Sequence, residues 1–278
     1  MKLYKKRLSD FLYKLYEQED IFLHVIDKYL QNKNNQYSIF FIENLNNFFI
    51  NDEGHLYISV MQSDYINSLA LYITSHNIPI TYVYGETSNV LDFNTFFKKG
   101  IEISLNYYVM KLDRKAFHNL PQLLINNSLT DRFCCPDDFF KLKNLQLMYH
   151  LEEVYSDTKN YPKQYEMNAF KKILNERDNY AVFIMNDPIS KVYINASSEK
   201  TIQIGGIYTL KKYRGNGFGY YCIYNFLKKT FNKYSHIESC QLFVKNTNMS
   251  AYSLYKKLGF QILSKTTSIY YKALKKKQ

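Results

Sequence analysis

The stretch YTLKKYRGNGFGYYCIYNFLKK, residues 208–229, places three glycines within five positions, at Gly215, Gly217 and Gly219. The whole chain of 278 residues contains only 9 Gly, so a third of them lie in this one loop. Glycine loses more conformational freedom on ordering than any other residue. A cluster of this kind therefore needs a reason, either a demanding turn or a ligand that touches the main chain.

The residues on either side of the cluster predict a strand, a loop and a helix, in that order. TIQIGGIYTL (residues 201–210) is typical of a strand, and YYCIYNFLKKTFNKY (residues 220–234) has the periodicity of an amphipathic helix. The first amides of a helix have no intrahelical partner and carry partial positive charge, so the loop is suited to hold a pyrophosphate. A tight turn that uses glycine for geometry alone is the alternative. The loop is not a P-loop or a dinucleotide fingerprint, because G-K-[ST] and G-x-G-x-x-G are both missing.

A second motif stands about thirty residues later, in NMSAYSLYKKLGF, from Asn248 to Phe260. Together the two motifs resemble the GNAT superfamily of acyl-CoA N-acyltransferases. The family loop Q/R-x-x-G-x-G/A is matched by Arg214, Gly217 and Gly219. The later signature N-x-x-A-x-x-L-Y-x-K-L-G-F is matched by Asn248, Ala251, Leu254, Tyr255, Lys257, Leu258, Gly259 and Phe260. The motifs occupy residues 203–260, and the element order fits over residues 138–272, but no motif covers residues 1–113.

The resemblance implies a binding site for acyl-CoA. Its pantetheine arm would pair with the main chain at Ile207, Tyr208 and Thr209, and Asn248 would contact the same arm. Its pyrophosphate would lie on the loop that follows Arg214, on the amides of Gly215, Asn216, Gly217, Phe218, Gly219 and Tyr220. The co-substrate implied is acetyl-CoA, with no metal ion. Lysines near the loop are candidates for the adenosine phosphates or ordinary surface residues.

The resemblance also implies that Tyr255 is the acid that protonates the departing thiolate. Many family members carry a glutamate base eleven positions before the first loop residue, and Gln203 stands there in this chain. An amide does not accept a proton near neutral pH. Three options follow: the amine arrives with a lowered pKa, another group such as His150, Glu166 or Glu199 acts through water, or the protein binds acyl-CoA without efficient turnover.

The remaining elements predict an α/β protein with a mixed sheet and two domains. Residues 126–278 are expected to form the GNAT domain, and residues 1–125 an accessory α/β domain. Mixed helix and strand patterns continue through the N-terminal part to Asp113. That part is either a degenerate GNAT-like copy without the glycine loop or an unrelated substrate module.

Composition narrows the function classes only coarsely. The formal net charge of +11 suits a nucleic acid, an anionic membrane surface or a polyanionic small molecule. The 4 Cys lack a CxxC spacing, and no apolar run approaches the roughly 18 residues that span a bilayer. We expect a cytoplasmic protein without a membrane, nucleic-acid or metal partner. The sequence does not predict the oligomeric state.

The sequence thus predicts an acetyl-CoA-dependent N-acetyltransferase that acts directly on a primary amine of a small molecule or peptide. A non-catalytic acyl-CoA-binding or regulatory module is one alternative, and Gln203 favours it. An aminoacyl-tRNA-dependent transferase is another, but the intact loop from Arg214 to Gly219 argues against it, because such enzymes need no CoA cradle.

Overall fold

The computed structural model describes residues 3–31, 38–42, 44–59, 62–121, 129–155, 159 and 161–272. Within this part the chain divides into two compact units, and their boundaries run through strands. Unit 1 takes the described parts of residues 3–110, 243–249 and 262–272, and unit 2 takes those of residues 111–242 and 250–261. The predicted cut between residues 125 and 126 lies outside the described residues and stays a prediction.

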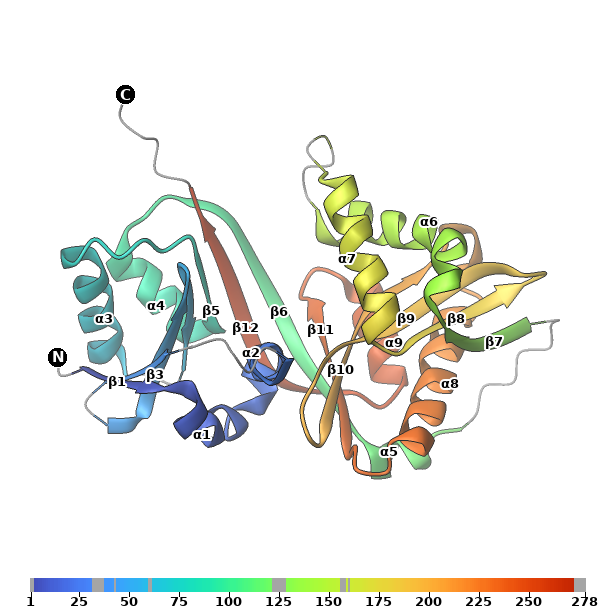
Figure 1. Ribbon diagram of the computed structural model, residues 1–278, viewed down its shortest axis with the longest axis horizontal. Coiled ribbons are helices and arrows are strands. Elements are labelled where there is room, and N and C mark those ends of the chain that lie inside the picture. The colour runs from blue at the N-terminus through green and yellow to red at the C-terminus, as the bar shows by residue number, and fades with distance from the viewer. Residues whose placement is uncertain are drawn as a thin grey trace. The chain divides into compact units, whose positions relative to one another are not determined.

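Unit 1 is a mixed sheet with helices packed on it (Figure 1). The order of its strands is β1-β2-β3-β4-β5-β12-β6. The strands are β1 (Leu3–Arg7), β2 (Ser38–Ile42), β3 (Asn44–Asp52), β4 (His55–Ile58), β5 (Tyr82–Glu86), β6 (Ile101–Asp113) and β12 (Gln261–Tyr271), the last two shared with unit 2. The helices are α1 (Leu12–Tyr16), α2 (Glu19–Gln31), α3 (Ser63–Ser75) and α4 (Thr87–Phe97), with a 3₁₀ turn at Leu8–Phe11.

The C-terminal strand β12 completes the sheet of unit 1. It pairs antiparallel with β5, from Thr266↔Glu86 to Tyr270↔Tyr82. The partners are about 180 positions apart, and a hydroxyl bond from Thr267 to Thr87 spans the same gap. This long-range pairing explains why the two units interleave along the chain.

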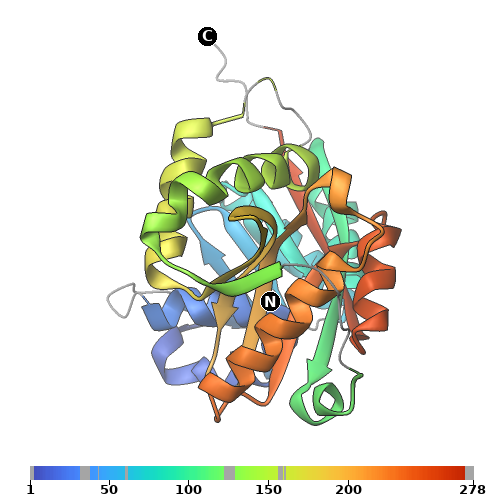
Figure 2. The same cartoon turned by 90° about the vertical axis from the view of Figure 1, so that its right-hand side faces the viewer.

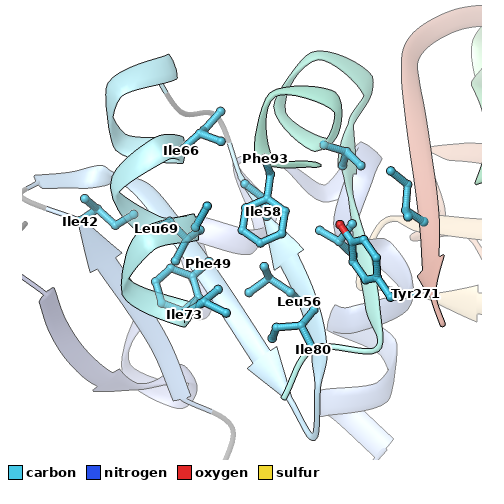
Figure 3. Packing of buried hydrophobic residues seen from close by; sticks show 14 residues of the cluster. Ile42, Phe49, Leu56, Ile58, Ile66, Leu69, Ile73, Ile80, Phe93 and Tyr271 are labelled. Atoms are coloured by element: carbon cyan, nitrogen blue, oxygen red, sulfur yellow. The ribbon is translucent and has the colours of Figure 1, made fainter. Parts of the chain in front are cut away.

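The core of unit 1 lies between the sheet and helices α3 and α4 (Figure 3). Ile66, Leu69 and Ile73 follow the helical repeat on α3, and all three are buried. They pack in one cluster with Phe93 of α4 and Leu56 of β4. Burying one such side chain contributes about 1.5–3 kcal/mol, so the cluster is a major source of stability in this unit. A second buried cluster of the unit includes Leu15, Phe22 and Phe41.

Three local predictions in unit 1 differ from the structure. The helical periodicity of the first thirty residues is preceded by strand β1, which pairs antiparallel with β2. The sequence predicts strands over residues 37–43 and 55–61 joined through a turn at residues 51–54, whereas the structure has a further strand, β3, between them. Asp64 was expected to cap a helix, but α3 begins at Ser63 with Gln62 at the cap position.

Unit 2 contains neighbouring strands of mixed direction, in the order β11-β10-β9-β8-β7. Its strands are β7 (Leu129–Cys134), β8 (Asn179–Ile184), β9 (Asp187–Ser197), β10 (Thr201–Thr209) and β11 (Ser239–Lys245), the last shared with unit 1. Its helices are α5 (Arg114–His118), α6 (Phe139–Tyr149), α7 (Lys163–Glu176), α8 (Phe218–Lys233) and α9 (Met249–Lys257). Neighbouring strands are antiparallel except β10 and β11, which are parallel.

The helices of unit 2 cover both faces of its sheet. The ammonium of Lys191, on β9, lies over the rings of Tyr149 on α6 and Phe170 on α7. The preceding residue, Ser190, interacts with Cys222 on α8. Successive strand residues point to opposite faces, so α6 and α7 cover one face and α8 covers the other. In Figure 2, α8 (orange) lies in front of these strands.

Candidate functional site

Strand β10 leaves its parallel partner part-way along its length. Its register with β11 runs from Thr201↔Ser239 to Gln203↔Gln241, while its register with β9 continues to Thr209. Among the described residues, the parallel register includes none of Ile207, Tyr208 and Thr209. The residues predicted to pair with the pantetheine arm therefore lie on the part of β10 that has left the parallel ladder.

A bulge reshapes β10 just before these residues. The register with β9 shifts between Gly205 and Tyr208, and Gly206 takes a positive φ of 56°. A Cβ at Gly206 would lie 1.8 Å from Cε1 of Tyr193, so only glycine fits beneath that ring. Bulges re-aim the residues that follow them, and here those are the predicted pantetheine-binding residues.

The glycine loop turns the chain from β10 into α8. A 3₁₀ turn spans Lys211–Tyr213, and Gly215 and Gly217 both have φ near +80°. Gly217 is the N-cap of α8 and has no side chain that could cap the first amides. Non-glycine residues adopt such φ values at a cost of about 1–2 kcal/mol, which explains these two glycines.

Gly219 serves a different purpose, because its φ is not positive. A Cβ there would meet Cδ2 of Leu254 and Oγ1 of Thr209, each at 3.3 Å. The first turn of α8 therefore packs closely against α9 and the end of β10. A larger residue would push these elements apart.

Most side chains of the loop hold the loop itself. The amide of Asn216 donates to the carbonyl of Arg214 at 3.1 Å. Phe218 is buried and meets the ring of Tyr213 edge-on. The hydroxyl of Tyr220 donates to the carbonyl of Pro121 at 3.3 Å. A ligand of this loop would therefore meet main-chain atoms, as the resemblance implies.

Arg214 is fixed by three contacts. Its Nε donates to the carbonyl of Thr209 at 2.9 Å, and its Nη1 donates to Oε1 of Glu152 at 2.5 Å. Its guanidinium lies 5.0 Å from the centre of the Tyr208 ring. Its hydrogen bond to Glu152 is the main cause that raises the pKa of the Arg214 guanidinium, and the same contact lowers the pKa of the Glu152 carboxyl.

Sequence reasoning missed Glu152. The stretch at residues 138–155 predicts one continuous helix, but α6 ends at Tyr149 and a π-helical turn, His150–Val154, follows. Single π turns occur frequently at functional sites. Nothing in the sequence pairs Glu152 with Arg214, because 62 positions separate them.

Two of the residues considered as alternative bases lie side by side. His150 Nδ1 is 3.5 Å from Oε2 of Glu166 and 2.8 Å from the hydroxyl of Tyr161. Tyr155 donates a short hydrogen bond to Oε1 of Glu166. Burial lowers the pKa of His150, so the neutral imidazole predominates near pH 7. Glu199, the third candidate, is exposed in the turn between β9 and β10.

Gln203 lies at the last register pair of the two parallel strands. Its side chain is buried, and its Oε1 has no hydrogen-bond partner among the described residues. The side chain of its register partner, Gln241, is also buried, and neither of its amide atoms has a partner in the described part of the chain. An amide at this point can orient a group but does not remove a proton.

Tyr255 is the predicted acid and lies on α9. Its side chain is 6% exposed, and its ring meets that of Phe260 edge-on at 6.1 Å. Burial raises the pKa of the Tyr255 hydroxyl, so the group keeps its proton throughout the neutral range. Asn248 precedes α9, and its amide donates to the carbonyl of Lys245 at 2.9 Å. Asn248 belongs to the segment 243–249 of unit 1, whereas the glycine loop belongs to unit 2.

A buried lysine is a second feature that the sequence reasoning missed. Lys191 is 2% exposed and donates to the carbonyl of Gly206 at 2.6 Å. Burial lowers the pKa of Lys191 to about 7. A single lysine inside a strand whose other residues are mostly apolar is the only signal for it in the sequence.

The described residues contain no group of three or more His, Cys, Asp or Glu side chains arranged to hold a metal ion. In the same part of the chain, no helix is both long enough and apolar enough to cross a bilayer.

Comparison with protein families identifies one region of the chain. Residues 145–260 match the family model described as Acetyltransferase (GNAT) family. The chain contains a GNAT domain. The match includes the π-helical turn, the bulged strand, the glycine loop and Tyr255, so the resemblance drawn from the two motifs is confirmed. Comparison with curated proteins gives no match.

The similarity to solved structures covers more of the chain than the GNAT domain. A Drosophila protein has a TM-score of 0.65 at 11% identity, over 97% of this chain and 98% of its own. A GNAT-family acetyltransferase from Colwellia psychrerythraea has a TM-score of 0.60 at 14% identity, over 98% and 100%. A tandem GNAT protein from the clavulanic acid biosynthesis pathway has a TM-score of 0.56 at 8% identity, over 99% of each chain.

These similarities confirm the predicted mixed α/β fold over almost the whole chain. At such identities they show the fold alone. The match in fold to the tandem GNAT protein includes the N-terminal part of the chain as well as the GNAT domain.

Proposed function

We propose that this protein is an acetyl-CoA-dependent N-acetyltransferase of the cytoplasm that acts directly on a primary amine of a small molecule or peptide. The observation that carries the proposal is the geometry of β10 and its loop. The parallel register stops at Gln203, a bulge re-aims Ile207 to Thr209, and the uncapped N-terminus of α8 follows at Gly217. These are the main-chain features that a strand-like pantetheine and a pyrophosphate require.

The chemistry is a direct transfer. The amine nitrogen attacks the thioester carbonyl carbon, the C–N bond forms and the C–S bond breaks. The amine loses one proton, and the departing thiolate takes a proton from Tyr255. An amine of pKa about 10.4 is mostly protonated at pH 7, and the gap of about 3.4 units costs about 4.6 kcal/mol.

The amine must lose its proton to a group near the site. Gln203 does not take it. Burial lowers the pKa of His150, which keeps its imidazole neutral near pH 7, and His150 lies beside Glu166, so this pair is our candidate to accept the proton through water. In this scheme Tyr255, protonated because it is buried, acts only as the acid.

The second candidate function is acyl-CoA binding without turnover. The amide of Gln203 in place of a carboxylate favours it. Release of free thiol with a panel of amines separates the two functions: binding without thiol release, for every amine tested, supports the second candidate.

The test of the cofactor itself is calorimetry with acetyl-CoA. The wild-type protein is expected to bind, and Gly217→Asp to lose binding, because a carboxylate at the N-cap repels the pyrophosphate and competes for the helix amides. Gly217→Asn is the matched control, since asparagine has nearly the same shape and tolerates a positive φ. No heat with the wild-type protein, or equal binding by the Asp and Asn variants, refutes the proposed cradle.

A further inference from the structure

The carboxylate of Glu152 contacts two residues of the predicted acyl-CoA site and a lysine that lies between them in the chain. Its Oε1 accepts from Arg214, the first residue of the loop motif, at 2.5 Å. Its Oε2 accepts from the hydroxyl of Tyr208, on the predicted pantetheine strand, at 3.0 Å. Lys211, in the 3₁₀ turn between them, has its Nζ 3.6 Å from the same oxygen.

These contacts hold the Arg214 side chain against Glu152 and β10, with 41% of it still exposed. Its Nη1 donates to Glu152, and its Nε donates to the carbonyl of Thr209. The side chain therefore fastens the start of the loop to the end of β10.

The π-helical turn that carries Glu152 is itself held from the other side. His150, two residues earlier, contacts Tyr161 at 2.8 Å and Glu166 of α7 at 3.5 Å. Its Nε2 lies 2.8 Å from the amide nitrogen of Gln146 on α6. Glu152 is thus presented from a turn that α6 and α7 hold in place.

We propose that Glu152 is a positioning residue, which holds the segment from Tyr208 to Arg214 in the conformation that binds acyl-CoA. The inference depends on the proposed function for the identity of the ligand. The role of Glu152 in ordering the loop does not depend on it. A charge-assisted hydrogen bond to Arg214, a bond from Tyr208 and the nearby ammonium of Lys211 all depend on one carboxylate. Without the Glu152 carboxylate, both ends of the segment are released. The ligand must then order the segment when it binds, and this cost lowers its affinity.

The first arm of the test uses the full chain without ligand. Hydrogen exchange is measured on the wild-type protein, Glu152→Gln and Glu176→Gln. Glu176 is a matched control, because its carboxylate lies 3.9 Å from Lys172 on the surface of α7, away from the loop. Glu152→Gln is expected to speed exchange of amides in residues 208–217 about tenfold, while Glu176→Gln leaves them unchanged. Equal exchange in all three proteins overturns the proposal.

The second arm is calorimetry with acetyl-CoA. Glu152→Gln is expected to raise Kd about tenfold, and Glu176→Gln to leave it unchanged. The double variant Glu152→Gln/Arg214→Gln is expected to lose clearly less than the sum of the two single losses, because the contact between Glu152 and Arg214 is already broken in either single variant. Unchanged Kd in Glu152→Gln, or additive losses in the double variant, overturns the proposal.

The two arms separate this inference from the proposed function. If the wild-type protein does not bind acetyl-CoA, the proposed function fails, and the exchange experiment alone decides whether Glu152 orders the loop. If the wild-type protein binds and the exchange rates change without any change in Kd, the positioning role for the ligand is refuted. Should Glu152→Gln not fold, Arg214→Gln provides the same exchange measurement from the other side of the contact.

Discussion

The ammonium of Lys191 donates a hydrogen bond of 2.6 Å to the carbonyl of Gly206, at the bulge of β10. The rings of Tyr149, Phe170 and Tyr193 lie 4.9–5.5 Å from that nitrogen. The hydrogen bond joins β9 to the residue that sets the direction of the predicted pantetheine strand. The Lys191 amine thus lies in an aromatic interior, and burial lowers the pKa of Lys191 from 10.5 to about 7.

Lys191 makes the stability of the protein depend on pH in the neutral range. In the unfolded chain its amine keeps its proton up to about pH 10.5, but in the folded protein only up to about pH 7. Between these values the unfolded state binds more protons, so the free energy of unfolding rises with pH. From pH 7.0 to 8.5 the expected rise is about 1.5 kcal/mol. Urea unfolding of the wild-type protein and Lys191→Met measures it.

Other groups titrate outside this window. Burial lowers the pKa of His150 and His24, so these residues change the free energy of unfolding mainly below pH 6.5. Burial raises the pKa of Cys134 and Cys222 to about 12, and their effect begins only near pH 9. Lys191→Met should therefore remove most of the rise between pH 7.0 and 8.5. The same slope in both proteins would show that Lys191 is not the group responsible.

Gly206→Ala is expected to destabilise the fold far more than Gly215→Ala. Both residues have a positive φ, so each alanine costs about 1–2 kcal/mol of backbone strain. The new methyl at 206 also meets the ring of Tyr193 at 1.8 Å, whereas nothing lies within 4 Å at 215. Overpacking adds about 1–3 kcal/mol, which gives about 2–5 kcal/mol for Gly206→Ala. Urea midpoints of the two variants decide it, and equal midpoints contradict the role of the bulge.

The sequence was sufficient for the parts of the site that lie close together in the chain. Arg214, Gly217 and Gly219 are separated by only a few positions, and the strand and helix around them have clear periodicities. The backbone at Gly217 follows from a local rule, since a positive φ strongly favours a residue without a Cβ. The α/β class and the GNAT domain could therefore be predicted.

The contacts between distant segments could not be predicted in this way. Glu152 meets Arg214 across 62 positions, and β12 pairs with β5 across about 180. The same limit applies to the pair of His150 and Glu166, which the sequence named separately and the fold brings to 3.5 Å. Such pairings depend on tertiary packing, which neither periodicity nor spacing encodes.

Gln203→Glu is expected to supply the missing base. Position 203 is 5% exposed, so burial would raise the pKa of a new carboxyl above its ordinary value of about 4.3 and make it a better base. Positioned bases contribute about 10²–10⁴-fold, and a gain of at least about tenfold in kcat near pH 7 is expected, with the pH–rate profile moved to lower pH. Gln203→Leu is the control that removes the amide without adding a base. A profile that Gln203→Glu leaves unmoved would show that proton removal occurs elsewhere, as the pair of His150 and Glu166 allows.

Tyr255→Phe is expected to lower kcat about 10²-fold and to leave Kd for acetyl-CoA unchanged, because a phenol lost from general acid catalysis affects the chemical step and not binding. Tyr252→Phe, on the same helix, is the control and should retain full activity. The raised pKa of Tyr255 means that the acid keeps its proton well above pH 8, so its titration should not limit the wild-type rate in that range. Thiol release and calorimetry on the same preparations measure both quantities. Loss of binding together with rate would instead assign the Tyr255 hydroxyl a role in holding the cofactor site, because phenylalanine keeps the ring contact with Phe260 at 6.1 Å.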